Sequence, residues 1–429
     1  MRVWIVNHHA IPPSEPGGTR HYSLARELVR RGHDVTVLAS SFNHATGKQI
    51  SGTKGKLSTR AEFDGVAFLT LRVPGYHGRV ARFWNMLVFA FKVWCGIGTR
   101  YMSKPDIVIG SSLTPFAALA AARLAQLFGV PFVLEIRDLW PQTLIDMGMS
   151  RQHPVVLGFG IIERYLYRNA ASIITLLPNA AEYMSSRGAG TTEITWIPNG
   201  VQVNLVPFLP LTQHKVFTVM YAGSHGLSDV LDPVIDAAAI LQKRAPGRFC
   251  FRFIGGGPSK DGLRARVREN DLANVVFEDP APKVELFAKL YEADAFIIAM
   301  KKTDLYRYGI SPNKLHDYMA AGRPTIVAGT VHNNPIADAA AGITVPPEDP
   351  QAIAEAVETL AAMPMDERRN MGLRARQYVE RRHDFAVLAL RLEGVLQSAL
   401  VSFAERRSSL VNVRKGEPIE VEVSGGNVH

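Results

Sequence analysis

The most constraining feature of this 429-residue chain is a regular alternation of short apolar runs with stretches of helical periodicity. In the first half, apolar runs occur at Val3–Asn7, Asp34–Ala39, Ile107–Ser111 and Phe132–Ile136. Strands that alternate with helices build parallel sheets covered by helices on both faces. The chain is therefore predicted to be an α/β protein, and residues 1–205 are predicted to form a Rossmann-like domain.

The same alternation restarts at Phe217–Gly223, after a linker, Pro198–Lys215, that shows little periodicity. A second Rossmann-like domain is predicted over residues 206–384. Residues 385–404 are predicted to form a C-terminal helix that packs back on the first domain, and residues 405–429 a polar, poorly ordered tail. Ligands bind beyond the carboxyl ends of the strands in such sheets, so we expect the two domains to face each other across a ligand-binding cleft.

Composition excludes several classes of protein. With 47% hydrophobic and 20% charged residues, the chain is not mainly disordered. Its two cysteines, Cys95 and Cys250, are too few for a disulfide scaffold or a cysteine-based zinc site, which indicates a reducing compartment. The first ten residues are typical of a buried strand rather than a secretory signal, and no run of about 18 uncharged apolar residues predicts a membrane-spanning helix.

The net charge of +9 lies entirely in the first half of the chain. Residues 1–205 hold 21 Lys+Arg and 12 Asp+Glu, whereas residues 206–429 hold 27 of each; residues 48–104 alone hold ten basic and two acidic residues. Within that segment, Arg79–Arg100 reads RVARFWNMLVFAFKVWCGIGTR. An apolar, aromatic stretch flanked by cations is typical of a helix in a membrane interface. A buried core helix has a similar pattern, and both interpretations stay open.

Two motifs of the first half contain candidate functional residues next to predicted strand or helix ends. Gly17 and Gly18 directly precede a predicted helix, where bare backbone amides can approach a phosphate or a sugar; a tight turn would use the same glycines. The spacing is not GxGxxG, so a dinucleotide fingerprint is absent. In EIRDLWP, Arg137 and Asp138 end a strand, where they can orient an acceptor hydroxyl or stabilise a developing charge. A structural salt bridge is the alternative.

In the second half, YAGSHG follows the first predicted strand of the domain. Gly223 frees the backbone there, and the amides of Ser224 and His225 are candidates to bind a diphosphate. A short glycine turn on its own is a common structural element, but its position matches that of the Gly17–Gly18 loop in the first domain.

The segment Lys301–Pro324, KKTDLYRYGISPNKLHDYMAAGRP, is the most specific motif. A helix is predicted to begin near Asn313 and Lys314, so that its N-terminus and the lysine present positive charge to a phosphate. Asp317 lies one turn later, in position to accept hydrogen bonds from ribose hydroxyls. A capped helix with a surface lysine would show the same pattern.

Taken in this order and spacing, the motifs resemble those of the family-4 retaining glycosyltransferases, which have the GT-B fold. The resemblance covers the whole ordered chain and rests on PGGTRHYSLARELVRRGHDVTVL, WIPNGV, YAGSHG, FIGGGP and SPNKLHDYMAAGRPTIVA. EIRDLWPQTL further resembles the bacterial branch that builds O-antigen and capsule repeat units on a lipid carrier, and within it the fucosamine transferases.

The resemblance implies transfer of a sugar, expected to be an N-acetylated amino sugar, from a UDP-sugar to a polyprenyl-diphosphate-linked saccharide with retained configuration. The donor would bind the second domain, through the residues Gly223, Ser224, His225, Asn313, Lys314 and Asp317. Arg137, Asp138 and Lys302 are the candidate catalytic residues, and Gly17 and Gly18 the acceptor or phosphate loop. In this family the departing phosphate takes the acceptor proton, so Asp138 is only a candidate base.

The resemblance also implies whether a metal is needed and where in the cell the enzyme acts. No metal cofactor is expected, because cations and helix ends neutralise the leaving group. The enzyme is expected in the cytoplasm, on the anionic inner face of the plasma membrane. One departure stands out: the family's two glutamates, eight residues apart, are replaced here by Gly309 and Asp317.

Two other functions fit the predicted fold. A nucleotide-sugar epimerase would need no lipid acceptor, and the basic, aromatic segment 79–100 argues against it. A non-catalytic protein that binds a sugar nucleotide or nucleic acid is the other alternative. The neutral second half with its phosphate motif argues against that class, and no nucleic-acid partner is expected.

Overall fold

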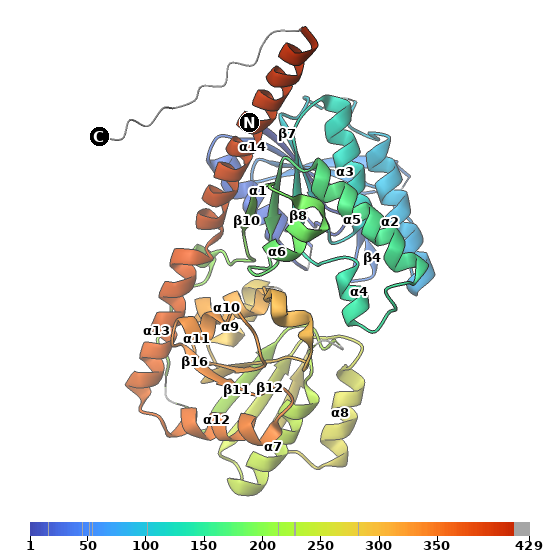
Figure 1. Cartoon of the computed structure of the whole chain (residues 1–429). Helices are drawn as coiled ribbons and strands as arrows, with labels where there is room; N and C mark the ends of the chain where they lie inside the picture. The colour runs from blue at the N-terminus through green and yellow to red at the C-terminus, as the bar shows by residue number, and fades with distance from the viewer. Residues whose placement is uncertain are drawn as a thin grey trace, which may run out of the picture.

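The computed structural model describes residues 1–15, 17–44, 46–50, 52–53, 55–100, 102–212, 214–226, 229–281 and 283–415. They form two α/β domains, each with its own sheet, placed end to end (Figure 1). This confirms the predicted architecture of two Rossmann-like domains.

The first domain is built on an eight-stranded sheet of order β10-β9-β8-β7-β1-β2-β6-β5, in which only β5 and β6 pair antiparallel. Its strands are β1 (Arg2–Val6), β2 (Asp34–Ser40), β5 (Ser58–Phe63), β6 (Val66–Leu71), β7 (Ile107–Ser111), β8 (Phe132–Ile136), β9 (Ser172–Thr175) and β10 (Ile194–Trp196). A small hairpin joins β3 (Phe42–Asn43) and β4 (Lys48–Gln49). The central strands are continuous buried apolar runs because helices cover both faces.

The second domain has a fully parallel six-stranded sheet of order β13-β12-β11-β14-β15-β16. Its strands are β11 (Phe217–Ala222), β12 (Phe249–Ile254), β13 (Val275–Glu278), β14 (Ala295–Ala299), β15 (Thr325–Ala328) and β16 (Gly342–Val345). This is the order of nucleotide-binding sheets, in which a crevice opens where the strand order reverses, here between β11 and β14.

Helices surround both sheets. In the first domain they are α1 (Arg20–Arg30), α2 (Arg79–Trp94), α3 (Pro115–Phe128), α4 (Gln142–Asp146), α5 (Pro154–Asn169) and α6 (Ala181–Met184), which runs into a π-helical turn, Ser185–Ala189. A short 3-10 turn, Val203–Leu205, lies in the linker. In the second domain they are α7 (Asp232–Arg244), α8 (Lys260–Glu269), α9 (Lys283–Leu290), the 3-10 helix η3 (Asp304–Tyr308), α10 (Asn313–Ala321), α11 (Pro335–Asp338), α12 (Pro350–Ala362) and α13 (Met365–Arg382).

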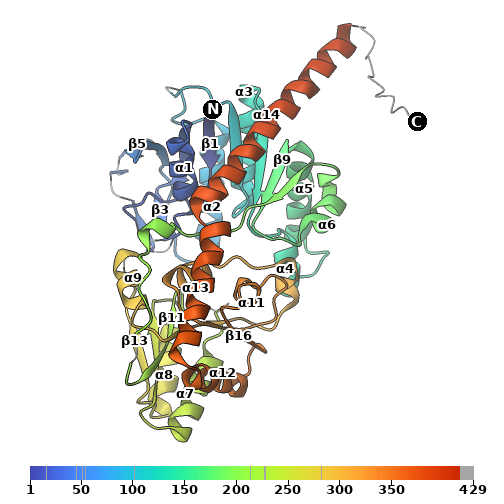
Figure 2. The ribbon, with the colours of Figure 1, turned by 90° about the vertical axis from the view of Figure 1, so that its left-hand side faces the viewer.

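The last helix, α14 (Phe385–Lys415), leaves the second domain and lies along the first (Figure 2). Leu388, Leu392 and Leu396 are buried in the core that includes α1, and Glu393 pairs with Arg31. Among the described residues, the stretch Phe385–Ser408 of this helix has the length and composition to cross a membrane. Its buried leucines show that in this structure it packs against the first domain.

The C-terminal tail differs from the expectation. Residues 405–415, ERRSSLVNVRK, continue α14 instead of forming a poorly ordered tail. Residues 416–429, the remainder of the predicted tail, lie outside the described residues.

Candidate active site

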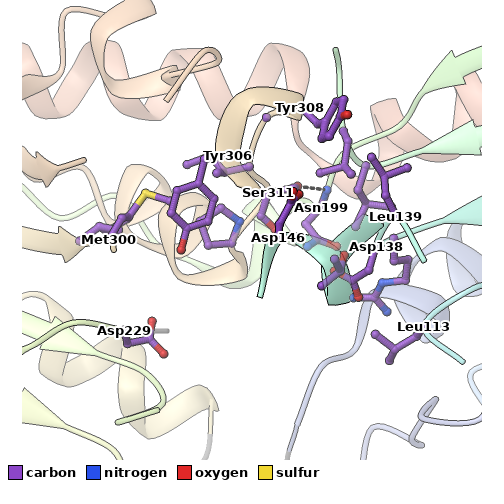
Figure 3. Close-up of a pocket in the computed structure, with 18 of the residues that line it drawn as sticks. Leu113, Asp138, Leu139, Asp146, Asn199, Asp229, Met300, Tyr306, Tyr308 and Ser311 are labelled. Carbon is purple, nitrogen blue, oxygen red and sulfur yellow. Dashed lines mark hydrogen bonds between the residues drawn. The ribbon is translucent and has the colours of Figure 1, made fainter. Parts of the chain in front are cut away.

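A cavity of about 360 Å³ lies between the two domains, beyond the carboxyl ends of β8, β9 and β14 (Figure 3). The first domain lines it with Leu113, Arg137, Asp138, Leu139, Gln142, Thr143, Asp146, Leu176, Leu177 and Asn199; the second with Asp229, Ile298, Ala299, Met300, Tyr306, Tyr308, Gly309, Ile310, Ser311, Pro312 and Lys314. The position matches the predicted cleft, and three residues singled out from sequence, Arg137, Asp138 and Lys314, meet here.

The first-domain wall carries Arg137 and Asp138 directly after β8. Arg137 Nε is buried without a hydrogen-bond partner among the described residues. Burial raises the pKa of the Asp138 carboxyl, and the Arg137 guanidinium only partly opposes this rise. The wall therefore offers a cation with an unused donor beside an acid that protonates more readily than an exposed aspartate.

A third ionisable group on this wall, Asp146 at the end of α4, was not predicted. Its Oδ1 accepts from Gln142 Nε2 at 2.7 Å and lies 3.5 Å from Arg307 of the second domain. Its Oδ2 is buried and has no hydrogen-bond partner in the described part of the chain. The sequence signal for Asp146 is weak: it lies eight residues after Asp138, at the end of the short helix that follows β8.

On the opposite wall, Lys314 is the second residue of α10. Its ammonium pairs with the Asp229 carboxylate and contacts the Tyr221 hydroxyl, and it lies 4.4 Å from the centroid of the Tyr221 ring. Burial lowers the pKa of Lys314, and Asp229 opposes that decrease. Asp229 was also not predicted, because no local pattern joins two residues 85 positions apart.

The position of α10 depends on β11. Tyr318 of α10 is fully buried, accepts a hydrogen bond from Ala222 N at 2.6 Å and donates to Ala222 O at 3.0 Å. At Gly223 a side chain would place its Cβ 2.9 Å from Lys314 Cε, so a residue without a side chain is needed for the lysine to lie over this turn. The two motifs of the second domain therefore form one structural unit.

His225 differs from the expectation. Its backbone N–H, predicted to be available to a diphosphate, donates to Gly256 O at 2.9 Å. Its ring is buried, and both ring nitrogens have no hydrogen-bond partner within the described residues. Burial, with the nearby Lys260 and Lys314, lowers its pKa to about 4, so the ring is neutral at pH 7. The neighbouring Ser224 uses its carbonyl to accept from the Tyr221 hydroxyl at 2.5 Å.

The glycine loop of the first domain faces the second domain. A Cβ on Gly18 would lie 3.9 Å from Asn313 Nδ2, so this loop and the N-terminus of α10 approach each other across the cleft. Gly17 has a φ of 141°, which favours glycine. Neither glycine lines the cavity itself; the loop closes the cleft from another side.

Two other predicted residues are not brought to the cavity. The Lys302 side chain is exposed, and its backbone N–H donates to Glu348 Oε1 at 2.9 Å, because the chain after β14 turns toward the loop between β16 and α12. The catalytic position expected for Lys302 is therefore not supported by this geometry. Asp317 is half-buried on α10, one turn after Asn313, and does not line the cavity.

A buried ion network lies behind the first-domain wall. Glu135 accepts from Arg20 Nε at 2.9 Å and pairs with His21 at 2.6 Å. Burial alone would raise the pKa of Glu135, but His21 and Arg20 hold it well below its ordinary value. Arg20 also donates to the carbonyl of Ile197. Three sequence motifs are thus joined by this network, whose role is structural.

The two domains are also tied at the edge of the cavity. Asn199, in WIPNGV, donates its backbone N–H to Ser311 Oγ at 2.7 Å, and its side-chain amide donates to Ser311 O. Gly309, on the same second-domain loop, has a φ of 105°, and a Cβ there would lie 2.5 Å from Pro178 Cδ. A glutamate at this position would therefore be strained and would require Pro178 to move.

The described residues hold no group of three or more His, Cys, Asp or Glu side chains placed to bind a metal ion. The charge of the cavity comes from Lys314 and Arg137 and from three carboxylates, Asp138, Asp146 and Asp229. Such a site can neutralise an anionic leaving group on one wall and hold a hydroxyl-bearing substrate on the other.

Comparisons with known proteins agree with this arrangement. The model of the glycosyl transferase 4-like domain matches residues 17–200, and that of glycosyl transferases group 1 matches residues 216–363. No curated protein sequence matches the chain.

Solved structures of similar fold cover nearly the whole chain. Sucrose-phosphate synthase from Thermosynechococcus elongatus has a TM-score of 0.71 at 16% identity, covering 94% of this chain and 99% of that one. Anabaena Alr3699/HepE in complex with UDP and glucose has a TM-score of 0.66 at 14% identity, covering 92% and 99%. Trehalose-6-phosphate synthase OtsA has a TM-score of 0.67 at 11% identity, covering 92% and 99%.

At these identities the structures establish the fold alone, and they do not distinguish a polysaccharide branch. The two family models, however, divide the chain as its two sheets do. The chain belongs to the glycosyltransferases of the GT-B fold.

Proposed function

We propose that this enzyme transfers a sugar, an N-acetylated amino sugar, from a UDP-sugar to a polyprenyl-diphosphate-linked saccharide with retention of configuration. The observation that carries the proposal is the composition of the interdomain cavity: Lys314 at a helix start on one wall, Arg137 and Asp138 on the other. Similar structures contain UDP with glucose or UDP-glucose, which supports a UDP-sugar as the donor.

The donor diphosphate would bind at the N-terminus of α10. There the helix amides and Lys314 provide positive charge where a phosphate is to be released, so no metal ion is needed. Asn313 and Asp317 follow on the same helix, and Asp317 would accept from the ribose hydroxyls. The Gly223 turn leaves room for Lys314 and the diphosphate together.

The acceptor would bind the first-domain wall. The bond from the anomeric carbon to the diphosphate oxygen breaks, the acceptor oxygen bonds to that carbon on the same face, and the acceptor proton passes to the departing phosphate. Lys314 stabilises the diphosphate charge, while Arg137 and Asp138 orient the acceptor and the Asp138 carboxylate stabilises the developing positive charge on the sugar. The Gly17–Gly18 loop, opposite Asn313, would border the acceptor entrance.

The proposed setting is bacterial O-antigen or capsule biosynthesis, in the fucosamine-transferase branch, on the cytoplasmic inner face of the plasma membrane. The motif EIRDLWPQTL and the basic excess of residues 48–104 support it. Attraction to anionic lipid is screened by salt, so membrane binding should weaken as ionic strength increases.

Incubating the purified protein with UDP-N-acetylhexosamines and a polyprenyl-diphosphate-linked sugar tests the proposal. The expected product is an extended lipid-linked saccharide whose anomeric configuration, read by NMR, equals that of the donor. Conversion of the UDP-sugar to its epimer without an acceptor would instead establish the epimerase alternative. Tight UDP-sugar binding without turnover on any acceptor would establish the non-catalytic alternative.

A further inference from the structure

The outer surface of the first domain carries a long apolar groove between α2 and α3, of about 780 Å³. We call it the α2–α3 groove; Trp84, Leu87 and Phe91 of α2 line one side, and Phe116 and Leu119 of α3 the other. Among the described residues, Lys92 is the only charged side chain in its lining. Because its ammonium donates to Arg72 O at 2.7 Å, the groove itself offers little for a polar ligand.

Helix α2 has two apolar faces. Phe89 and Val93 are buried in the domain core, as the core-helix interpretation predicts. Trp84 and Phe91, by contrast, are 59% and 67% exposed, which a core helix does not explain. The core-helix interpretation of Arg79–Arg100 therefore explains only the inner face of this helix, and the outer face is exposed among the described residues.

The helices on this side of the first domain carry mainly positive charge. Helices α2, α3 and α5 together contain six Lys or Arg residues and one acid, Glu163, which is buried. On α5, the exposed Leu157 and Ile161 lie beside the exposed Arg164 and Arg168. An apolar surface bordered by cations fits a hydrocarbon chain that ends in an anionic group.

A row of aromatic side chains leads from the groove to the candidate active site. Ring contacts join Phe83 of α2 to Phe116 at 5.5 Å, Phe116 to Phe159 of α5 at 5.5 Å, and Phe159 to Trp140 at 5.7 Å. Trp140 lies two residues after Asp138, which lines the interdomain cavity. One molecule can thus lie with its chain along this row and its polar end at the cavity.

We propose that the α2–α3 groove binds the isoprenoid chain of the acceptor lipid, and so determines that the acceptor is lipid-linked. This inference rests on the proposed function for the identity of the chain, but binding of the chain can be measured without any sugar transfer. A protein partner is less well matched, because the groove presents almost no hydrogen-bonding side chains among the described residues, and helices α2, α3 and α5 hold six cations against one buried acid.

Farnesyl phosphate, a short soluble isoprenoid, is the direct test ligand. Titration should change the fluorescence of the groove tryptophans, Trp84 and Trp94, whereas inorganic phosphate should not. The double variant W84E/F91E removes apolar side chains that are exposed, so the fold should be retained, and it should weaken farnesyl phosphate binding by about tenfold or more.

A matched control is available on α14. Leu390 and Val401 are 54% and 57% exposed, so L390E/V401E makes the same change of charge and exposure away from the groove. The control should bind farnesyl phosphate as the parent does. Equal binding by W84E/F91E and parent, or no binding by the parent, would overturn the inference.

Transfer assays separate the groove from the proposed function. W84E/F91E should lower kcat/KM on a polyprenyl-linked acceptor by about tenfold while leaving turnover on a short-chain acceptor with the same diphosphate sugar unchanged. If the parent transfers to neither acceptor but binds farnesyl phosphate, the proposed function fails and the groove stands. If the parent self-associates without lipid and W84E/F91E is monomeric, the groove is instead an interface between copies.

Discussion

The two walls of the interdomain cavity use their charges differently. On the second-domain wall, the ammonium of Lys314 is already paired with Asp229 and Tyr221. On the first-domain wall, Arg137 Nε and Asp146 Oδ2 are buried without hydrogen-bond partners in the described residues. A buried polar atom without a hydrogen bond destabilises the protein, so a ligand that pairs with Arg137 or Asp146 would remove an unfavourable free energy. On the second-domain wall, a ligand that binds Lys314 must instead replace a partner that the lysine already has.

The second-domain wall therefore has its polar groups paired without a ligand, whereas the first-domain wall keeps buried polar atoms without hydrogen-bond partners among the described residues. Substitutions on the first wall should therefore act on turnover with acceptor, and substitutions on the second wall on binding of the nucleotide.

The largest effect is expected for Asp138→Asn on the first-domain wall. Loss of a carboxylate beside the reacting sugar should lower kcat by about a hundredfold while UDP affinity changes little. Since burial raises the pKa of Asp138, parent activity should fall on acidification at a higher pH than for an ordinary aspartate, and the variant should lack this acidic decline. A variant with parental kcat and the same acidic decline would remove Asp138 from the site. Initial rates across pH, with UDP binding by calorimetry, measure both.

Lys314→Ala should act on the other wall. A charge-assisted contact contributes about 1.5–3 kcal/mol, so UDP affinity and turnover should fall about ten- to hundredfold, without loss of the fold. Lys243→Ala, at an exposed lysine of α7, is the matched control and should behave as the parent. Unchanged UDP binding in the Lys314 variant would contradict the assignment of the diphosphate to α10.

The fold was largely predictable because its determinants are local. Apolar runs such as Ile107–Ser111 and Phe132–Ile136 are strands at the predicted positions, since burial on both faces of a parallel sheet requires continuous apolar residues. The edge strand β5, STRAEF, was missed because it is paired on one side only and carries polar residues. The α14 extension was missed because its last turns are polar.

The site was predictable only where a motif marks it. Arg137, Asp138 and Lys314 stand at strand or helix ends that the pattern of the sequence reveals. Asp229 and Asp146 act through partners distant in sequence or through a turn of no distinctive composition, so periodicity does not reveal them. Lys302, predicted from its place at a strand end, is exposed and does not line the cavity, so its catalytic role stays a prediction.

A smaller effect is expected for Asp317→Asn. The substitution keeps the shape of the side chain and removes its charge, so contacts to ribose hydroxyls should weaken and UDP-sugar affinity should fall about three- to tenfold. Affinity for uracil alone should not change. Parental UDP binding by the variant would show that Asp317 serves only the helix.

The smallest effect, and the sharpest test of the difference between the walls, is expected for Asp229→Asn. In the parent, a diphosphate competes with Asp229 for the Lys314 ammonium, so removing that carboxylate charge should increase UDP affinity about two- to fivefold near neutral pH. Asp229 also opposes the lowering of the Lys314 pKa by burial. Without it, the lysine should lose its proton at a lower pH, and the gain in affinity should reverse as the solution becomes alkaline. Calorimetric titration of UDP into parent and variant from about pH 7 to about pH 10 measures the pH at which the two affinities become equal. A variant that binds UDP more weakly than the parent at neutral pH would show that Asp229 holds Lys314 in its binding position instead of competing with the ligand for it.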